Sequence, residues 1–397
     1  MVNDLPDRTS DLSNLIIQQI LHSSDCQISF AEYMEMALYH PHYGYYAANH
    51  GKIGAHGDFL TSPHLAVDFG ELLAEQFAEM WQVLGQPQPF TLVEIGAGQG
   101  LLATDVLSGL QRQHPDCFAA LEYVIVEKSA ALITEQQQRL KSWQSGVKIE
   151  WRSLDETPAD SIAGCVFSNE LIDAFPVHLV TLTDRKLQEI YVTAQPNGFA
   201  EVIDQPSTSR LTDYFDLNGI DLFSPNYSDG YRTEVNLAAL DWLGLVSDRL
   251  QRGYILTIDY GYAATRYYNS RRSQGTLQCY YQHSHHNNPY IHVGQQDITA
   301  HVDFTALERQ GDRCGLKTLG FTQQGLFLMA LGLGDRLTAL SQSDAKNAQD
   351  IQQAILRRDA LHQLMNPMGL GNFGVLIQSK GLTKQETERT LIGLREF

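Results

Sequence analysis

Residues 91–113, "TLVEIGAGQGLLATDVLSGLQRQ", pass from a short apolar run through a glycine-rich turn into a run with helical spacing. The first run is typical of a buried strand, and the second repeats apolar residues as an amphipathic helix does. The turn between them holds Gly96, Ala97, Gly98 and Gly100. Glycine lets a ligand approach the backbone closely, and the start of a helix adds unpaired N–H groups and a positive dipole. The stretch therefore predicts a ligand site between a sheet strand and its helix.

The spacing of the glycines separates two ligand classes. A dinucleotide-binding turn reads G-x-G-x-x-G, whereas here the third glycine comes one residue early and Leu101 stands in its place. The spacing G-x-G-x-G after Val93, Glu94 and Ile95 is typical of methyltransferases that bind S-adenosylmethionine. The alternative is a glycine-rich turn that holds no ligand.

Strand-like and helix-like runs alternate along the chain. Apolar runs typical of strands lie at residues 91–96, 122–129, 147–153, 163–169, 253–261 and 373–381. Runs with helical spacing, 101–113 and 130–143, separate the first three strands. This alternation predicts an α/β fold with a parallel, doubly wound sheet, in which ligands bind beyond the carboxyl ends of the strands.

The predicted domains follow from where strands and helices alternate. Residues before the first strand look mostly helical, and the alternation stops after Pro176, where antiparallel strands and turns follow. We therefore expect an N-terminal helical module over residues 1–90, a core that holds the sheet over 91–176 and 251–397, and an insertion at the carboxyl edge of the sheet over 177–250.

Three local expectations add detail to these domains. Thr61 or Ser62 is expected to cap one helix that continues to residue 85. Residues 205–230 are expected to be rich in loops. Residues 262–303 are expected to be a long irregular stretch, which in a compact protein is usually functional or disordered.

The acidic composition bears on the choice of partner. The chain carries 28 Lys and Arg against 46 Asp and Glu, a formal net charge of −18. Such a protein repels phosphate backbones and attracts cations. We therefore expect no nucleic-acid partner and favour a cationic one, such as a sulfonium cofactor or a basic peptide.

The cysteines and the N-terminus bear on the compartment. Five scattered cysteines form no C-x-x-C pair, which is typical of a reducing compartment. The first residues are acidic, unlike a signal or transit peptide, and no apolar run approaches the roughly 20 residues that span a bilayer. We expect a cytoplasmic protein of bacterial type without membrane insertion.

Acidic side chains follow the predicted strands. Glu127 ends the second strand, where a carboxylate can accept two hydrogen bonds from ribose hydroxyls, although an exposed glutamate at a strand end would look the same. Asp155 follows the third strand and could meet an adenine amino group. Both positions agree with a cofactor that carries adenosine.

The fourth strand leads into "SNELIDAFPVH", which contains Asn169, Glu170 and Asp173. Glu170 and Asp173 are three residues apart, so they share a face if the chain turns helically. Two carboxylates on one face can grip a planar guanidinium, because each accepts paired N–H bonds from it. Capping of the following turn, or pairing with basic residues of the fold, is the alternative.

Histidines gather in the segment "GTLQCYYQHSHHNNPYIHVGQQDITAHVDF". It contains His283, His285, His286, His292 and His301 beside Asp297 and Asp303. A metal site is conceivable from the count, but there is no cysteine pair and no H-E-x-x-H helix. We predict a polar lid and no metal. The chain also lacks the G-x-S-x-G and G-x-x-x-x-G-K-[ST] motifs of hydrolases and kinases.

Taken in order, these motifs resemble one family, the MidA-like S-adenosylmethionine-dependent methyltransferases, which are related to the mitochondrial complex I assembly protein arginine methyltransferase. The resemblance covers nearly the entire chain and is carried by "ISFAEYMEMALYHPHYGYYA", "GDFLTSPHLAVDFGELLA", "LVEIGAGQG", "SNELIDAFPVH", "GTLQCYYQH" and "DITAHVDFTAL". It implies the class I methyltransferase fold, a Rossmann-like sheet of seven strands whose last strand runs antiparallel inside the sheet.

The resemblance also implies the reaction and its residues. The expected reaction is methyl transfer to an arginine of a protein partner, in some members a subunit of respiratory or NDH-1 complex I. By the match, the cofactor would contact Glu94, Gly96, Gly98 and Glu127, and Asp58, Thr61 and Ser62 would close its pocket. Glu170 and Asp173 would orient the nucleophile, and His301 and Asp303 would steady these carboxylates or the acceptor.

The chain departs from the family pattern at two places. His64 stands where the family often has Glu, and Leu171 and Ile172 stand where it often has two aromatic residues. The sequence therefore indicates the cofactor more clearly than the methyl acceptor. Two rival functions stay open: a small-molecule methyltransferase, and an assembly factor that binds the cofactor without obligatory turnover. The oligomeric state also stays open, a homodimer included.

Overall fold

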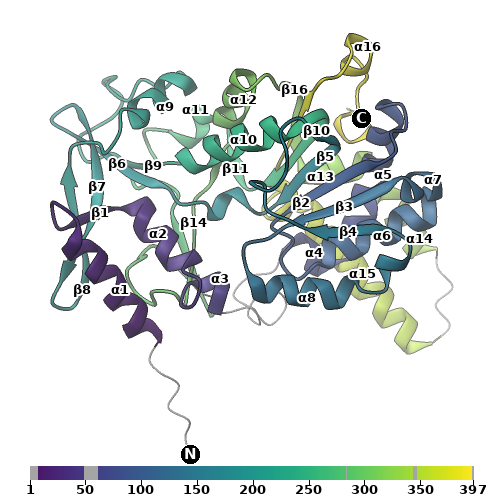
Figure 1. Cartoon of the computed structure of the whole chain (residues 1–397), viewed down its shortest axis with the longest axis horizontal. Coiled ribbons are helices and arrows are strands. Elements are labelled where there is room, and N and C mark those ends of the chain that lie inside the picture. Colours follow the sequence, from purple (N-terminus) through teal and green to yellow (C-terminus); the bar gives the residue numbers. More distant parts are fainter. Residues whose placement is uncertain (1–7, 49–60, 283, 343–346, 396–397) are drawn as a thin grey trace, which may run out of the picture. The chain divides into compact units, whose positions relative to one another are not determined.

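The computed structural model describes residues 8–48, 61–282, 284–342 and 347–395 (Figure 1). Within them the chain divides into two compact units. The first unit comprises the described parts of Met1–Phe59, Ile172–Trp242 and Gly261–Gln310. The second unit comprises those of Leu60–Leu171, Leu243–Tyr260 and Gly311–Phe397. Each unit has hydrophobic cores of its own.

The second unit contains a seven-stranded sheet in the order β16-β17-β10-β5-β2-β3-β4 (Figure 1). In chain order these strands are β2 (Phe90–Ile95), β3 (Leu121–Val126), β4 (Lys148–Trp151), β5 (Ile162–Asn169), β10 (Leu250–Asp259), β16 (Lys317–Gln323) and β17 (Gly374–Lys380). β10, β5, β2, β3 and β4 run parallel, and β17 runs antiparallel between β10 and β16. The mixed sheet with an antiparallel last strand is thus confirmed, whereas β16 is an addition to the predicted strands.

Burial explains why these strands read as continuous apolar runs. All six residues of β2 are buried, as expected for a central strand that is covered on both faces. α6 (Leu101–Gln113) follows β2 and α8 (Ala130–Leu140) follows β3, as the spacing predicts. The other helices of this unit are α4 (Ser62–Leu65), α5 (Asp68–Val83), α7 (Pro115–Ala119), α13 (Gln324–Ala330), α14 (Leu333–Ser341), α15 (Ala348–Met365) and α16 (Lys384–Thr387), with short 3₁₀ turns at η1 (Trp143–Ser145), η3 (Leu370–Asn372) and η4 (Ile392–Leu394).

The helix expected from Ser62 to residue 85 is instead two helices, α4 and α5. They separate because Ala66 adopts an extended conformation, with φ −156° and ψ 136°. Thr61 does occupy the N-cap position of α4, but its side chain makes no capping hydrogen bond. The prediction was therefore right about the helical character and wrong about continuity and about the cap.

The first unit is built on a five-stranded antiparallel sheet with the path β1-β7-β6-β9, on which β8 pairs with β7. Its strands are β1 (Gln27–Ser29), β6 (His178–Thr183), β7 (Lys186–Gln195), β8 (Gly198–Asp204) and β9 (Arg232–Val235). Its helices are α1 (Arg8–His22), α2 (Phe30–Tyr39), α3 (Tyr45–Ala48), α9 (Arg210–Asn218) and α11 (Ala264–Tyr267). Ser29 and Glu32 form a capping box that fixes the start of α2. α10 (Leu237–Arg249) and α12 (Phe304–Arg313) begin in the first unit and end in the second.

Two stretches expected to be irregular contain regular structure. Residues 205–230 include α9, because Leu211, Tyr214 and Phe215 recur at helical spacing and are buried in the core. Residues 262–303 include a three-stranded sheet of β12 (Gln278–Tyr281), β13 (Ser284–His286) and β14 (Asp297–Thr299), and a pair formed by β11 (Gly261–Tyr262) and β15 (Val302–Asp303). These strands have two to four residues, too short to show a periodic pattern in the sequence.

Candidate active site

The glycine turn leads directly into α6. Gly96, Gly98 and Gly100 have φ values of 74°, 53° and 75°, in the left-handed region that favours glycine, and Ala97 between them is buried. A Cβ atom on Gly96 would lie 2.8 Å from Cδ1 of Leu171, whereas one on Gly98 would meet no atom of the described residues within 4 Å. Gly100 is the N-cap of α6. The turn therefore needs glycine for its backbone, and no described residue fills the space beside Gly98.

Glu94 lies buried near the end of β2. The Tyr123 hydroxyl, on the neighbouring β3, donates a hydrogen bond to its Oε2 at 2.6 Å. Burial raises the pKa of Glu94 to about 7, because the desolvation of the carboxylate outweighs the hydrogen bond from Tyr123. The structure places Glu94 in the core immediately before the glycine turn.

Glu127 follows β3 and is tied to the glycine turn. Its carboxylate accepts hydrogen bonds from the Ser129 amide at 3.0 Å and from the Gln136 side chain at 3.2 Å. The same Gln136 nitrogen donates to the carbonyl oxygen of Gly98 at 2.7 Å. Burial raises the pKa of Glu127 above its ordinary value. Gln136 was not predicted from the sequence. The feature that could have indicated it is a polar side chain on the buried side of an amphipathic helix.

Residues at the start of α4 also reach the glycine turn. Thr61 Oγ1 and His64 Nδ1 are hydrogen-bonded at 2.6 Å, and His64 Nε2 is bonded to Gln99 Oε1 in the turn at 3.1 Å. Burial lowers the pKa of His64, so the neutral imidazole is favoured. Ser62 is fully buried. Asp58, predicted to act beside them, lies outside the described residues.

Asn169 ends β5, the strand next to β2, and Glu170 follows it directly. Glu170 has φ 50°, and its N–H donates to the Ile258 carbonyl of β10 at 2.9 Å. Its carboxylate oxygen Oε1 accepts hydrogen bonds from the Ser62 amide at 3.2 Å and from Asn169 Nδ2 at 3.1 Å. The structure thus brings together Asn169, Glu170 and Ser62, three residues that the sequence singled out from distant segments.

Asp259, at the end of β10, is a carboxylate that the sequence analysis missed. It is buried, and its oxygens accept from the Leu171 amide at 3.2 Å and from the Tyr260 amide at 2.8 Å. It therefore fixes the chain just after Glu170. The feature that could have indicated Asp259 is its position at the carboxyl end of a predicted parallel strand, where ligands bind. Asp155, by contrast, lies exposed in the turn after β4.

Asp173 belongs to the first unit, in the short turn η2 (Ile172–Ala174). It is buried, and its carbonyl oxygen accepts a hydrogen bond from the Ala300 amide at 2.9 Å. Tyr46 donates to Oδ1 of Asp297 at 2.9 Å, and burial and the charges of Asp297 and Asp173 raise the pKa of Tyr46. Buried acidic and phenolic side chains, Tyr46 among them, therefore surround Asp173.

His301 lies on an aromatic ring. Its imidazole stacks on Tyr262 with ring centroids 5.0 Å apart, and its amide donates to Thr276 Oγ1 at 3.1 Å. The guanidinium carbons of Arg266 and Arg272 lie 4.2 Å and 4.7 Å from the centroid of the same Tyr262 ring. Burial, with the help of these arginines, lowers the pKa of His301 to about 4. His301 is therefore neutral at neutral pH.

Asp303 fixes the start of α12. Its Oδ1 accepts from the Thr305 and Ala306 amides at 3.1 Å and 3.2 Å. Its Oδ2 accepts from Tyr214 at 3.3 Å and from Asn218 at 2.9 Å, both on α9. Burial raises the pKa of Asp303 to about 7. The structure places Asp303 as a capping residue that connects α12 with α9.

The histidine-rich segment forms strands. His285 and His286 lie on β13, and His292 stacks on Tyr281 with ring centroids 4.0 Å apart. His283 lies outside the described residues. Within the described ranges, the structure places no three His, Cys, Asp or Glu side chains where they could hold a metal ion together. No helix of the described residues has the length and apolar character that crossing a membrane requires.

The residues around the glycine turn fit S-adenosylmethionine. No part of the chain that the structure describes fills the space beside Gly98, and the N-terminus of α6 follows it. At the end of β5, Ser168 Oγ and Asn169 Oδ1 are buried and have no hydrogen-bond partner among the described residues. Because buried polar atoms normally find a partner, these two are suited to meet a bound polar group. Glu127 adds a carboxylate, a hydrogen-bond acceptor, directly after the next strand.

Comparisons with known proteins agree with this site. The model of a family described as S-adenosyl-L-methionine-dependent methyltransferases matches residues 72–322. The "Protein arginine methyltransferase NDUFAF7 homolog, mitochondrial" of Drosophila melanogaster is 31% identical over 372 residues, which cover 87% of this chain and 79% of that protein. "Protein arginine methyltransferase NDUFAF7, mitochondrial" of Homo sapiens is 28% identical over 386 residues, which cover 89% and 81%.

A solved structure matches over nearly the whole chain. The crystal structure of a protein from Burkholderia thailandensis bound to S-adenosyl-homocysteine superposes with a TM-score of 0.84 at 30% sequence identity, covering 97% of this chain and 95% of that one. The bound molecule is what remains of the cofactor after methyl transfer. On these grounds, the chain belongs to this family of S-adenosyl-L-methionine-dependent methyltransferases, and S-adenosyl-L-methionine is its cofactor.

Proposed function

We propose that this methyltransferase transfers the methyl group to an arginine side chain of a protein partner. The observation that carries the proposal is Glu170. It follows β5, the parallel strand next to β2 and the glycine turn, and its Oε1 accepts hydrogen bonds from the Ser62 amide and from Asn169 Nδ2. A carboxylate fixed in this way is suited to receive a guanidinium, which presents paired N–H donors in a planar fork.

The chain's residues contribute alignment and charge. When bound, S-adenosyl-L-methionine supplies an electrophilic methyl group on a sulfonium. Glu170 accepts N–H bonds from the acceptor guanidinium and so fixes which nitrogen faces the methyl carbon. Its negative charge stabilises the guanidinium, which stays cationic when the methyl has been added. A strong base is unnecessary, because the methylated nitrogen gives up its extra proton after the transfer.

The remaining predicted residues take roles in the same scheme. The turn Gly96 to Gly100 and Glu94 hold the cofactor, Glu127 binds its ribose, and Asp155 its adenine. Thr61 and Ser62 close the pocket. Asp173 is the second carboxylate for the acceptor, and His301 and Asp303 steady the acceptor side. Because Asp303 already accepts four hydrogen bonds, we assign it a positioning role through α9 and α12.

The arginine specificity is supported by the relatives. Those with 31% and 28% identity are named protein arginine methyltransferases. The net charge of −18 also favours a basic acceptor over an acidic one. Following the family resemblance, we propose a subunit of a respiratory or NDH-1 complex I-type assembly as the partner.

We also infer the class I arrangement for the second unit. The strand order, with β17 antiparallel between β10 and β16, is the order expected of that Rossmann-like sheet. In this interpretation residues 177–250 are a substrate-side insertion after the fourth strand, residues 1–90 an N-terminal module, and 91–176 with 251–397 the core.

Isotope-labelled S-adenosylmethionine tests the proposal. Wild type and Glu170→Gln are each incubated with lysate of a strain that lacks the protein, and labelled products are hydrolysed in acid for amino-acid analysis. Wild type should yield labelled methylarginine in one protein, and Glu170→Gln should reduce the rate about 100-fold or more, because one aligned charge is removed. The matched control is Asp160→Asn, an acidic residue that also has positive φ, at 48°, but lies exposed after β4.

Two other outcomes would replace the proposal. Label confined to small molecules would make the protein a metabolite methyltransferase. Absence of label from every fraction, with the unmodified target present, would favour an assembly factor that binds the cofactor without turnover. Equal rates for wild type and Glu170→Gln would remove Glu170 from the site.

A further inference from the structure

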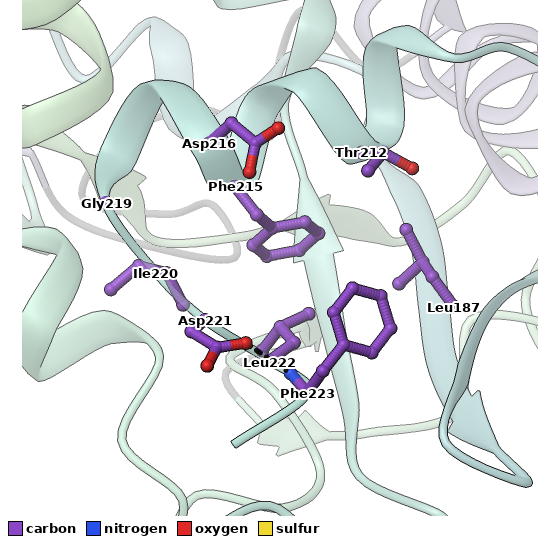
Figure 2. A pocket seen from close by; sticks show the side chains of 9 residues that line it. All are labelled: Leu187, Thr212, Phe215, Asp216, Gly219, Ile220, Asp221, Leu222 and Phe223. Carbon is purple, nitrogen blue, oxygen red and sulfur yellow. Dashed lines mark hydrogen bonds between the residues drawn. The ribbon is translucent and has the colours of Figure 1, made fainter.

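A pocket lies on the first unit, formed by α9, the segment that follows it and the start of β7. Its volume is about 260 Å³, and its lining includes Phe215, Asp216, Asp221, Leu222 and Phe223. Figure 2 shows the Phe215, Leu222 and Phe223 side chains around the hollow, with Asp216 and Asp221 on its border. We propose that this pocket binds the protein substrate, by taking an apolar side chain that is followed by lysine or arginine.

The pocket is built before any ligand arrives. Gly219, with φ 67°, ends α9, and Asp221 Oδ1 accepts a hydrogen bond from the Phe223 amide at 2.9 Å (Figure 2). The Arg185 side chain donates to the carbonyl oxygens of Phe223, Ser224 and Tyr227. Binding therefore loses little conformational entropy, because these bonds already fix the segment.

The chemistry of the lining selects the ligand. Phe223 is 47% exposed, although large aromatic side chains are usually covered, so the rim offers apolar surface. The charged groups in the lining are two carboxylates, and the Asp216 carboxylate has no hydrogen bond or ion pair among the described residues. The guanidinium of Arg185 keeps its positive charge but donates to the carbonyl oxygens of Phe223, Ser224 and Tyr227, and Arg185 is not one of the lining residues. A cation beside an apolar group complements this surface.

The pocket has room for a protein side chain. Its volume of about 260 Å³ lies at the lower limit of small-molecule sites, which usually enclose about 300–1,000 Å³. The inference rests on the proposed function, in which the acceptor is a protein. It names the part of that protein, apart from the methylated arginine, that this chain recognises.

One helix connects the pocket with a predicted site residue. On α9, Phe215 and Asp216 line the pocket, while Tyr214 and Asn218 donate to Oδ2 of Asp303 at 3.3 Å and 2.9 Å. A ligand that presses on Phe215 therefore acts on the same helix that holds Asp303. Substrate binding in the pocket can thereby stabilise the position of the "HVDF" segment.

The binding test uses the peptide acetyl-Gly-Leu-Arg-Lys-Gly-amide and the full-length protein, without cofactor. Saturation-transfer NMR should show the strongest transfer to the leucine methyl protons, and titration gives the affinity. Asp216→Asn and Asp221→Asn should each weaken binding about two- to fivefold, as expected for one exposed charge pair. Asn at 221 can still accept the Phe223 amide bond, so the fold is kept. Phe223→Ala should weaken binding, and Asp213→Asn, an exposed residue of α9 outside the pocket, should not.

Two results would overturn the inference: equal binding of acetyl-Gly-Leu-Glu-Glu-Gly-amide, or wild-type affinity in the doubly substituted Asp216→Asn, Asp221→Asn protein. A kinetic arm separates this inference from the proposed function. With the methylated protein as substrate, the double variant should raise the KM for that protein and leave kcat and the KM for S-adenosylmethionine unchanged. Methylarginine formation with an unchanged KM would refute the pocket alone, and pocket-dependent peptide binding without methylarginine would refute the arginine proposal alone.

Discussion

Replacement of Gly98 by alanine should separate cofactor binding from stability. Gly98 has φ 53°, and a Cβ atom there would meet no atom of residues 8–48, 61–282, 284–342 or 347–395 within 4 Å. An alanine in this left-handed conformation costs about 1–2 kcal/mol, and the smaller conformational freedom of its unfolded chain returns about 0.4–1 kcal/mol. The free energy of unfolding without cofactor should therefore fall by only about 1 kcal/mol.

Cofactor affinity should fall much further. If the cofactor approaches the backbone at Gly98, the added methyl group overpacks that contact by about 1–3 kcal/mol, which is about five- to 150-fold in affinity. Ligand at 100 times the wild-type Kd stabilises wild type by about 2.7 kcal/mol, and a thirtyfold weaker variant by only about 0.9 kcal/mol. Calorimetric titration with S-adenosylhomocysteine, and guanidinium unfolding with and without it, measure both quantities.

Gly85 offers a matched control. It has φ 80°, a Cβ atom on it would also meet no atom within 4 Å in the described ranges, and it lies exposed after α5 in the same unit. Gly85→Ala should lose the same 1 kcal/mol or so and bind S-adenosylhomocysteine as wild type does. Wild-type affinity in Gly98→Ala, or equal losses of affinity in both variants, would refute the assignment of the turn.

Three further predictions concern stability in the absence of cofactor. Burial raises the pKa of Glu94 from 4.5 to about 7, so the native state binds the extra proton between these values and stability falls as pH rises through this window. In urea unfolding from pH 5 to 8, the free energy of unfolding of Glu94→Gln should fall by up to about 3 kcal/mol less than that of wild type. An unchanged dependence on pH would contradict this prediction. Tyr123→Phe should lower the free energy of unfolding by about 1–3 kcal/mol, because it leaves the buried Glu94 carboxylate without its donor. Tyr254→Phe should be nearly neutral, because the buried Tyr254 hydroxyl has no hydrogen-bond partner among the described residues. Equal losses in the two variants would contradict this prediction. Asp68→Asn should cost about 3 kcal/mol in the same assay, because the buried Asp68 carboxylate accepts hydrogen bonds from two arginines, and a loss under 1 kcal/mol would mean that solvent screens these pairs.

The parallel sheet was predictable because its signal is local. Strands such as β2 are buried on both faces and are therefore mostly apolar, and the helices between them are apolar on one side. The glycine turn was predictable for the same reason, since its conformation excludes most other residues. α9 was missed because it spans nine residues and carries Asp and Asn, which are common in turns.

The hydrogen bonds of the site could be predicted only in part. Sequence shows which polar residues end the strands, but it does not show which distant residues meet them. The contact of Glu170 with Ser62 joins segments 108 residues apart, and the tie between Gln136 and Gly98 depends on the rotation of α8. Asp303 was predicted to face the acceptor, and sequence could not reveal that four donors from α9 and the start of α12 surround it.

The backbone of Glu170 provides a separate argument for its role. Eight described non-glycine residues have positive φ. Seven of them lie exposed, where turns account for the conformation. The eighth, Glu170, is partly buried directly after a strand. Such strain persists where the surroundings impose it, and it is frequent at functional sites. Glycine would adopt this conformation without strain but would bring no carboxylate. Glu170→Gly should therefore unfold within about 1 kcal/mol of wild type and transfer no methyl group. A large loss of stability with normal transfer would instead mean that Glu170 serves the fold.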